Sequence, residues 1–168
     1  LRLDVDDLGF IFSSGMENKS ISRFATLSRS MNSFFLWYVN RIAEEHKIYI
    51  TYSGGDDLFV IGNWKDIIEF SLTLRKRFSD YTCSNEAFSL SAGIGIFRHN
   101  YPVRFAAEAA GDLEQLSKGE WFDNKTGKPS AKNSVTLFGA TVSWDRLEEL
   151  NSLAGEIYDL LDENINSE

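Results

Sequence analysis

The sequence predicts an α+β fold of the ferredoxin-like, split βαβ type, with an antiparallel sheet, helices on one face and an extra C-terminal helix. Two observations predict this class. Segments in which apolar and polar residues alternate are interspersed with segments in which apolar residues recur every three or four positions. Their order along the chain is β-α-β-β-α-β-α-β-α, and only Gly54-Gly55 separates the second strand from the third.

The first strand and the first helix differ in the spacing of their apolar residues. Residues 1–6 alternate, so three apolar side chains lie on one face while Asp4 and Asp6 lie on the other. We expect residues 9–20 to form a loop. From about residue 20 to residue 46, the spacing of three and four predicts a long helix whose apolar stripe packs into the core.

A hairpin and a second helix follow. We expect strands over residues 47–53 and 56–62, because a two-residue link such as Gly54-Gly55 supplies the positive φ angles of a tight turn. A helical pattern then begins at residue 63 or 64 and continues to about residue 81. In the split βαβ order the first strand is central and lies beside the strand that carries the glycine turn.

The last part of the chain predicts two strands and two helices around a long loop. Residues 88–97 form a strand and residues 101–117 form a helix. The loop covers residues 118–133. A short strand over residues 134–138 and an amphipathic helix over residues 143–161 complete the pattern.

Composition excludes several classes of protein. Of the 168 residues, 43% are hydrophobic and 14% aromatic, as expected for a globular domain and not for a disordered chain. The net charge of −8 argues against a surface that binds polyanions as a whole. Cys83 is the only cysteine, so no intrachain disulfide forms, and without a signal-peptide pattern this favours the cytoplasm. No apolar run reaches the ~18 residues that span a membrane.

Both ends of the sequence are abrupt. The chain begins directly with a strand pattern, without an initiator methionine, and its last helical pattern ends in a short polar tail. We therefore expect this sequence to be a piece of a longer protein.

Asp56 and Asp57 are the first candidates for a catalytic site. Adjacent carboxylates oppose each other's ionisation, and a divalent cation removes this penalty. Mg²⁺ prefers oxygen ligands, usually one or two carboxylates together with phosphate oxygens of the substrate. Gly54-Gly55 carries no side chains, so a triphosphate and its metal ions can approach the backbone. For this motif alone, a solvated hairpin is the alternative.

Asp4 and Asp6 in the first strand favour the metal site. Acidic residues in a central strand are hard to explain by solvation, but they can hold metal ions with Asp56 and Asp57. We predict two-metal phosphoryl transfer, with Asp4, Asp56 and Asp57 as catalytic residues and metal ligands. One ion, held by Asp4 and Asp56, lowers the pKa of an attacking 3′-hydroxyl, and the other stabilises the triphosphate and the leaving pyrophosphate. Asp57 completes the metal shell or accepts the hydroxyl proton.

Nucleotide contacts are predicted from backbone groups and small residues. We expect the N–H groups of Asp7, Leu8 and Gly9 to bind phosphate oxygens, as turn amides do. In the strand over residues 88–97, one face is large and apolar and the other holds only Ser and Gly. Because Gly weakens a strand unless another group approaches closely, we expect a nucleotide to lie across Gly93.

Further nucleotide contacts are predicted from polar side chains. Lys118, at a helix end, and Lys132, just before a strand, are the candidates for phosphate contacts in the long loop, for which a solvated loop without ligand is the alternative. Ser53 has no nearby His to act as a base. We therefore expect it to contact a sugar or phosphate and not to act as a nucleophile.

Several motifs occur in order over about residues 1–140. They are Leu3-Asp4-Val5-Asp6-Asp7-Leu8-Gly9, Ser22-Arg23 with Leu27-Ser28, Tyr52-Ser53-Gly54-Gly55-Asp56-Asp57-Leu58, Leu90-Ser91-Ala92-Gly93-Ile94 and Lys132-Asn133. Together they resemble the GGDD palm of the large subunit of type III CRISPR effector complexes. The resemblance implies a palm that polymerises ATP into cyclic oligoadenylate messengers when the assembled complex binds target RNA.

The resemblance also implies the cofactors and the partners. It implies a nucleotidyltransferase with two Mg²⁺ or Mn²⁺ ions, with Asp4, Asp56 and Asp57 as ligands and Gly54-Gly55 in the ATP pocket. The implied partners are ATP and other subunits of the complex, with guide and target RNA acting indirectly and no membrane involved.

The same resemblance implies a domain organisation. Residues 1–140 would form the GGDD palm, and residues 141–168 a C-terminal helix leading into a following helical domain. The nuclease domain and the first palm of that family lie outside this sequence, and the expected compartment is the prokaryotic cytoplasm.

Diguanylate cyclases, whose palm is similar, are the main alternative. Their strand motif continues Asp-x-Asp-x-Phe-Lys where this chain has Leu8-Gly9, and their glycine turn ends in Phe where it has Leu58. The first helix region also lacks a clear Asn and Asp pair for reading guanine, which favours adenine by analogy. The remaining possibility is a non-catalytic scaffold palm, against which the intact acidic triad argues.

Overall fold

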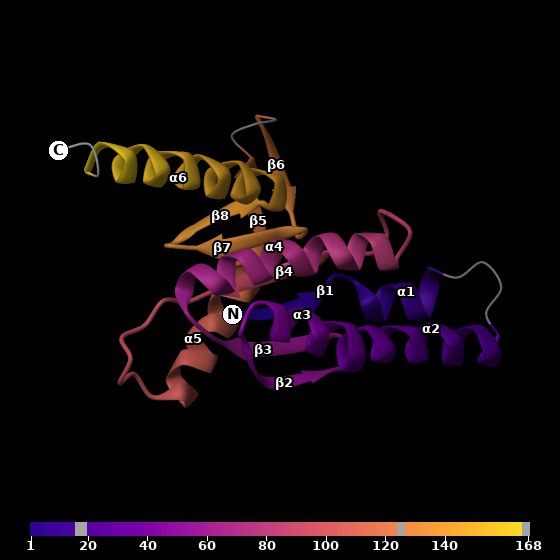
Figure 1. Ribbon diagram of the computed structural model, residues 1–168. Helices are drawn as coiled ribbons and strands as arrows, with labels where there is room; N and C mark the ends of the chain where they lie inside the picture. Colours follow the sequence, from indigo (N-terminus) through magenta and orange to yellow (C-terminus); the bar gives the residue numbers. More distant parts are fainter. Residues whose placement is uncertain (16–19, 124–126, 166–168) are drawn as a thin grey trace.

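The fold is built around one six-stranded sheet, which a computed structural model describes for residues 1–15, 20–123 and 127–165 (Figure 1). A separate two-stranded sheet pairs β5 (Glu120–Asp123) with β6 (Lys128–Ala131). The strands of the main sheet are, in spatial order, β2 (Tyr49–Gly54), β3 (Asp57–Ile61), β1 (Arg2–Val5), β4 (Leu90–Ile94), β7 (Ser134–Leu137) and β8 (Ala140–Ser143).

β1 lies inside this sheet, between β3 and β4. It is antiparallel to both, and its residues alternate between fully and partly buried. β4 and β7 are parallel, while the β2–β3 and β7–β8 pairs are antiparallel. The α+β fold class is therefore confirmed, as is the place of the first strand beside the strand of the glycine turn.

All four helices predicted from the sequence are present. The helix predicted over residues 20–46 is formed in three continuous parts, α2 (Ile21–Ser33), the π-helical η1 (Phe34–Tyr38) and α3 (Val39–Glu45). The other predicted helices correspond to α4 (Trp64–Tyr81), α5 (Val103–Lys118) and α6 (Trp144–Ile165), and α1 (Leu8–Ser14) is an additional helix that was not predicted. Over the described ranges, no helix combines the length and apolar character needed to cross a membrane.

The hydrophobic core lies between one face of the main sheet and η1, α3 and α4. Phe34 of η1 is fully buried, and its ring centroid lies 5.1 Å from that of Phe78 in α4. Trp144, at the start of α6, is 1% exposed, and its indole N–H donates to the Leu90 carbonyl at 2.8 Å. The predicted apolar stripe does not pack over its whole length, because α2 extends beyond the sheet and Ile21 is 90% exposed (Figure 1).

α5 lies on the other face of the sheet. A Cβ atom at Gly93 of β4 would lie 2.3 Å from the Glu114 nitrogen and 2.4 Å from the Ala110 oxygen, so the α5 backbone packs directly against this strand. The Arg2 side chain of β1 passes beside Gly111 of the same helix. The expectation that all helices lie on one face of the sheet is therefore wrong for α5. This helix can pack closely against β4 because β4 carries no large side chain on that face.

Two segments expected as loops contain regular structure. The loop expected over residues 9–20 is helical in its first part, where α1 ends at Ser14, and residues 16–19 lie outside the described residues. The loop expected over residues 118–133 contains the β5–β6 hairpin, and residues 124–126 lie outside the described residues. Elements this short show too few periods to be distinguished from loops by pattern alone.

The β2–β3 hairpin turns one residue later than predicted. Gly54 pairs with Asp57 in the ladder, so the two turn residues are Gly55 and Asp56 and not Gly54-Gly55. Gly55 has a φ of 68°, which glycine adopts without the strain of a side chain. The shift matters for the site, because it places one aspartate in the turn and the next in the ladder.

Candidate active site

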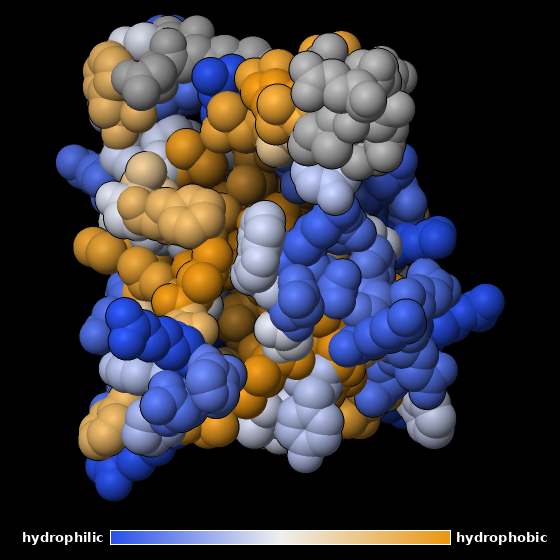
Figure 2. All heavy atoms as spheres, turned by 60° about the vertical axis from the view of Figure 1, so that its left-hand side comes forward, coloured by the Kyte–Doolittle hydropathy of each residue, from blue (hydrophilic) through white to orange (hydrophobic). Residues whose placement is uncertain are grey.

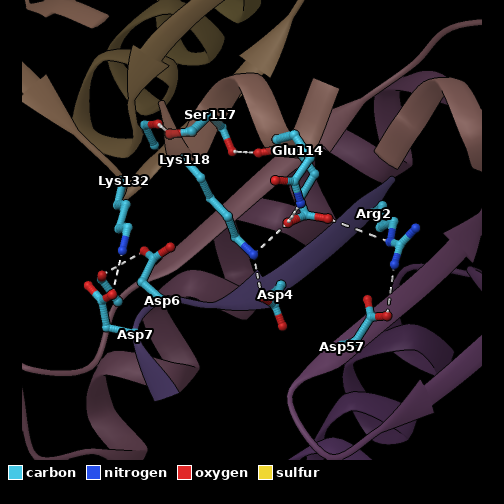
Figure 3. A network of polar contacts seen from close by, with 12 residues as sticks. Arg2, Asp4, Asp6, Asp7, Asp57, Glu114, Ser117, Lys118 and Lys132 are labelled. Atoms are coloured by element: carbon cyan, nitrogen blue, oxygen red, sulfur yellow. Dashed lines mark hydrogen bonds and ion pairs between the residues drawn. The ribbon is translucent and has the colours of Figure 1, made fainter. Parts of the chain in front are cut away.

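Carboxylates from two strands meet at the end of β1, where the β2–β3 turn lies against it. Asp4 is paired directly with Asp57 in the β1–β3 ladder, and the Val5 amide donates to the Asp56 carbonyl at 3.1 Å. Asp4 and Asp57 lie on the face of the sheet away from the core helices (Figure 3). The structure thus brings together the segments that carry the three predicted metal ligands.

Arg2 and Lys118 neutralise two of these carboxylates. The Arg2 Nη2 lies 3.2 Å from the Asp57 Oδ2, and the Lys118 Nζ forms an ion pair with the Asp4 Oδ2. Both cations also contact Glu114 of α5, the Lys118 Nζ at 2.6 Å and the Arg2 Nε at 3.5 Å. The result is a continuous chain of ion pairs across the sheet face (Figure 3).

Burial and neighbouring charges set the protonation of the Asp4–Lys118 pair. Burial raises the pKa of Asp4, Lys118 opposes this, and the negative charges of Asp56 and Glu114 raise it further. Burial lowers the pKa of Lys118, but its hydrogen bonds to Asp4 and Glu114 outweigh burial, so that pKa is raised. Lys118 is therefore held as an ammonium, and the effect of Asp56 on Asp4 shows that the two charges are close.

The residues present fit divalent cations of the Mg²⁺ class. Asp4, Asp56 and Asp57 offer the oxygen donors that these ions prefer. The Asp57 Oδ1 is buried and has no hydrogen-bond partner, which is uncommon for a carboxylate oxygen. Within the described residues no group of three potential ligands is already gathered around one point. This is compatible with ions that need only one or two carboxylates and take further ligands from substrate.

The corner between β1 and α1 carries the predicted phosphate amides. Asp7 has a left-handed φ of 54°, and Leu8 and Gly9 begin α1 directly after it. A Cβ atom at Gly9 would meet nothing within 4 Å, so this side of the corner is open. Lys132 reaches the corner from the segment after β6, and its Nζ forms an ion pair with Asp7. Phosphate binding by these residues stays a prediction.

The two predicted lysines lie at the site but contact carboxylates. Lys118 contacts Asp4, and Lys132 contacts Asp7, so each stands beside a residue predicted to act there. Their role as phosphate contacts stays a prediction, and it requires both side chains to exchange a carboxylate for a phosphate oxygen.

Ser53 lies on the other face of the sheet from Asp4 and Asp57. It pairs with the buried Leu58, and its hydroxyl donates to the Phe35 carbonyl at 2.7 Å. The next contact of this strand with the helices is made by the Gly55 amide, which donates to the Asn32 Oδ1 at 3.2 Å. The structure gives Ser53 a contact that anchors the hairpin to the helices, and its contact with a nucleotide stays a prediction.

The expectation that a nucleotide lies across Gly93 is wrong. The α5 backbone occupies that space, with the Glu114 nitrogen and the Ala110 oxygen within 2.4 Å of where a Cβ would stand. The small residues on this face of β4 admit a helix and not a ligand. Close approach was correctly inferred from the glycine, but the approaching group is protein.

The sequence did not predict two charged residues of the site, Arg2 and Glu114, and it gave a third, Asp6, a different role. Arg2 and Glu114 complete the ion-pair chain, and only the packing of α5 onto β1 brings them to it. Asp6 lies just after β1 and is 2% exposed, with its Oδ2 accepting from the Ser89 hydroxyl at 2.7 Å and the Asn133 amide at 3.0 Å. Through its Oδ2, Asp6 therefore ties three segments together, while its Oδ1 is buried without a hydrogen-bond partner, and its place beside Asp4 as a metal ligand stays a prediction.

An apolar cavity lies away from the carboxylates. A cavity of about 430 Å³ is lined by Leu1, Val60 and Ile94, at the opposite ends of β1, β3 and β4 from the acidic residues. The segment between β4 and α5 forms part of its wall, on the side of the molecule that Figure 2 turns forward. That view shows a band of hydrophobic residues across this side. We place the chemistry at the carboxylates, because this cavity offers no cluster of acidic groups.

Known proteins match the part of the chain that contains these carboxylates. A family model described as "Cas10/Cmr2, second palm domain" matches residues 1–136. Two relatives are named "CRISPR system single-strand-specific deoxyribonuclease Cas10/Csm1 (subtype III-A)". The one from Streptococcus thermophilus is 42% identical over 87% of this chain and 19% of its own length, and the one from Mycobacterium tuberculosis is 37% identical over 88% and 20%. The chain thus spans about a fifth of the length of these relatives.

Solved structures are similar in fold and sequence. The Csm1-Csm4 cassette in complex with cA3 and the same cassette in complex with pppApA each match with a TM-score of 0.74 and 28% identity. The cassette in complex with one ATP matches with a TM-score of 0.72 and 28% identity. Each of these comparisons covers 89% of this chain and 23% of the solved chain.

Proposed function

The chain belongs to the family of Cas10/Cmr2 second palm domains, and we propose that it binds ATP with two Mg²⁺ or Mn²⁺ ions and joins ATP into 3′–5′-linked cyclic oligoadenylate. The observation that carries this proposal is the direct pairing of Asp4 with Asp57 beside the Gly55-Asp56 turn. Two strands thereby present oxygen donors on one side of the sheet, next to a turn with little side-chain bulk.

The carboxylates hold the ions, and the surrounding residues hold the nucleotide. Asp4, Asp56 and Asp57 act as the metal ligands in this proposal. Bound there, the ions would supply Lewis-acid activation of a 3′-hydroxyl and stabilisation of the charge on the leaving pyrophosphate. Asp57, whose Oδ1 has no partner, is placed to complete the metal shell or to accept the hydroxyl proton.

Phosphate binding falls to the β1–α1 corner and to two lysines. The left-handed Asp7 turns the chain so that the amides of Leu8 and Gly9 follow at the start of a helix, where N–H groups lack intrahelical partners. Lys132 is already at this corner, and Lys118 is beside Asp4. When phosphate oxygens enter, both ammonium groups have an anionic partner within reach.

The reaction needs more than this chain. Joining two nucleotides requires two bound substrates, so we infer that a neighbouring domain of a longer protein completes the pocket. The Csm1-Csm4 structures with ATP, pppApA and cA3 support ATP as substrate and other subunits of a type III CRISPR effector complex as partners. Guide and target RNA act on the site indirectly in this proposal, in a prokaryotic cytoplasm.

A scaffold palm is the second candidate, and one observation favours it. Arg2 and Lys118 already form ion pairs with Asp57 and Asp4, so each of these two carboxylates has a cationic partner within the protein. In the scaffold reading these ion pairs are permanent, and the domain only packs against other subunits.

Calorimetric titration of the full chain with ATP and with GTP, in the presence of Mn²⁺, separates these readings. We expect ATP to bind only with metal, more tightly than GTP, and binding to be lost in the Asp56→Asn, Asp57→Asn double variant. Asp112→Asn, an exposed aspartate of α5, is the control and should bind as wild type does. Preference for GTP would point to a diguanylate-cyclase-like palm, and absence of binding to both nucleotides would favour the scaffold.

A further inference from the structure

Glu114 is an acidic residue inside the interface between α5 and the sheet. It is 2% exposed, and its two oxygens contact different cations, Oε1 the Lys118 Nζ at 2.6 Å and Oε2 the Arg2 Nε at 3.5 Å. A buried carboxylate is costly unless it is paired. Glu114 is paired, because it contacts both Lys118 and Arg2.

Those cations are the same ones that neutralise the predicted metal ligands. The order of ion pairs across the sheet is Asp4, Lys118, Glu114, Arg2 and Asp57, so each cation stands between Glu114 and one metal-ligand carboxylate (Figure 3). Three carboxylates share two cations. Lys118 and Arg2 can therefore leave Asp4 and Asp57 without becoming unpaired, because Glu114 stays beside them.

Divalent ions and these side-chain cations compete for the same oxygens. An ion at Asp4 would repel the Lys118 ammonium, which forms an ion pair with that carboxylate. We propose that Glu114 is a positioning residue that draws Lys118 and Arg2 away from Asp4 and Asp57 and so makes these carboxylates available to divalent cations. This inference rests on the metal site of the proposed function. It adds that metal affinity depends on a residue that touches neither metal nor substrate.

The same helix provides a matched control. Arg104 and Glu108 form another ion pair four residues apart on α5, at 3.1 Å, with side chains 85% and 57% exposed. Glu108→Gln removes the same charge from the same helix as Glu114→Gln, but outside the ion-pair chain. A general effect of net charge or of helix stability would therefore change Mn²⁺ binding similarly in both variants.

The experiment is Mn²⁺ binding to the full chain without nucleotide, measured from the free-ion signal in electron paramagnetic resonance. We expect Glu114→Gln to weaken Mn²⁺ binding about tenfold or more, because outer-shell partners of metal ligands have effects of this size. Glu108→Gln should stay within about twofold of wild type, as exposed ion pairs contribute little. Glu114→Asp keeps the charge but shortens the reach to the two cations, and it should also bind Mn²⁺ more weakly than wild type.

A double-variant cycle with Lys118→Met separates positioning from simple attraction. If Glu114 acts by drawing Lys118 off Asp4, Glu114→Gln should have a clearly smaller effect in the Lys118→Met background than in wild type. An equal effect in both backgrounds, with Glu114→Asp at the wild-type affinity, would show a through-space charge effect and overturn the inference. So would a Glu114→Gln affinity equal to that of Glu108→Gln.

The proposed function and this inference fail in distinguishable ways. If wild type binds no Mn²⁺, the metal site itself is refuted and the inference with it. If wild type binds Mn²⁺ and the Glu114 variants bind it equally well, only the inference is refuted. Melting curves of each variant show whether it is folded, and Glu114→Asp keeps the test available if Glu114→Gln is not.

Discussion

Three aspartates close together in the sequence, Asp4, Asp6 and Asp7, have three different surroundings. Asp4 is partly buried beside Lys118, in the ladder opposite Asp57. Asp6 is almost fully buried and accepts hydrogen bonds from two distant segments. Asp7 is exposed and has a left-handed backbone conformation, at the corner between β1 and α1. Chemical type alone therefore does not assign function here, because the environment decides whether a carboxylate is a ligand, a structural tie or a turn residue.

Gly93→Ala tests the place of α5 on the sheet. The added methyl group would meet the α5 backbone at 2.3–2.4 Å, and backbone can move aside only if the helix shifts. We expect the free energy of unfolding to fall by about 1–3 kcal/mol or more, measured by urea denaturation in metal-free buffer. Gly155→Ala in α6, where nothing lies within 4 Å, should leave stability unchanged or raise it by about 0.5–1 kcal/mol. Equal stabilities would contradict the packing of α5 on β4.

The β2–β3 hairpin is the element that sets the geometry of the site. Its ladder pairs Gly54 with Asp57, which leaves Gly55 and Asp56 in the turn. Asp57 is then directly opposite Asp4 across the β1–β3 pair. A shift of the turn by one residue would send alternate side chains to the other face, because strand residues alternate. The turn and the site are therefore determined together.

Gly55→Ala and Gly54→Ala test the position of the turn. Gly55 has a φ of 68°, and an alanine there should cost about 1–2 kcal/mol of unfolding free energy because side chains disfavour this region. Gly54 is in the strand, with its nearest neighbour 3.7 Å from a built Cβ, and an alanine there should be neutral or stabilise by up to about 1 kcal/mol. Chemical denaturation without metal gives both values. A larger loss at Gly54 than at Gly55 would place the turn where the sequence suggested.

At the scale of the whole molecule, the main sheet is covered unevenly. Core helices pack on one face, while on the other α5 lies against β1, β4 and β7 and leaves the β3 side to Arg2 and the carboxylates (Figures 1 and 3). The β5–β6 pair forms its own small sheet. An isolated two-stranded pair is marginally stable, so this part of the molecule should open more readily than the six-stranded sheet.

Hydrogen exchange followed by mass spectrometry tests this difference. Amides in β1, β3 and β4 should exchange only by openings close to the global free energy of unfolding, about 5–15 kcal/mol for a domain of this kind. Amides of β5 and β6 should exchange through local opening at about 0–3 kcal/mol, because all of their residues are exposed or half-buried. Equal protection in the two sheets would show that they unfold as one unit.

Much of the fold could be predicted from the local spacing of apolar residues. Residues 20–46 and 63–81 carry helical spacing over several turns, and both form helices. The short elements α1, β5, β6 and β8 were missed, since a few residues do not establish a period. In the candidate site, Asp4, Asp56 and Asp57 could be chosen by residue type, and their role as metal ligands stays a prediction, whereas Arg2 and Glu114 could not be chosen in this way.

By itself, the sequence determined the class of the fold, the order of its main elements and the acidic character of its site. These follow from local quantities: the spacing of apolar residues, the glycines of one turn and the charges beside them. Only the tertiary structure decided that Asp4 faces Asp57, that Asp6 is a buried tie, and that Gly93 receives a helix and not a nucleotide. The physical reason is that register and helix placement depend on contacts between segments up to 127 residues apart, which no local pattern contains.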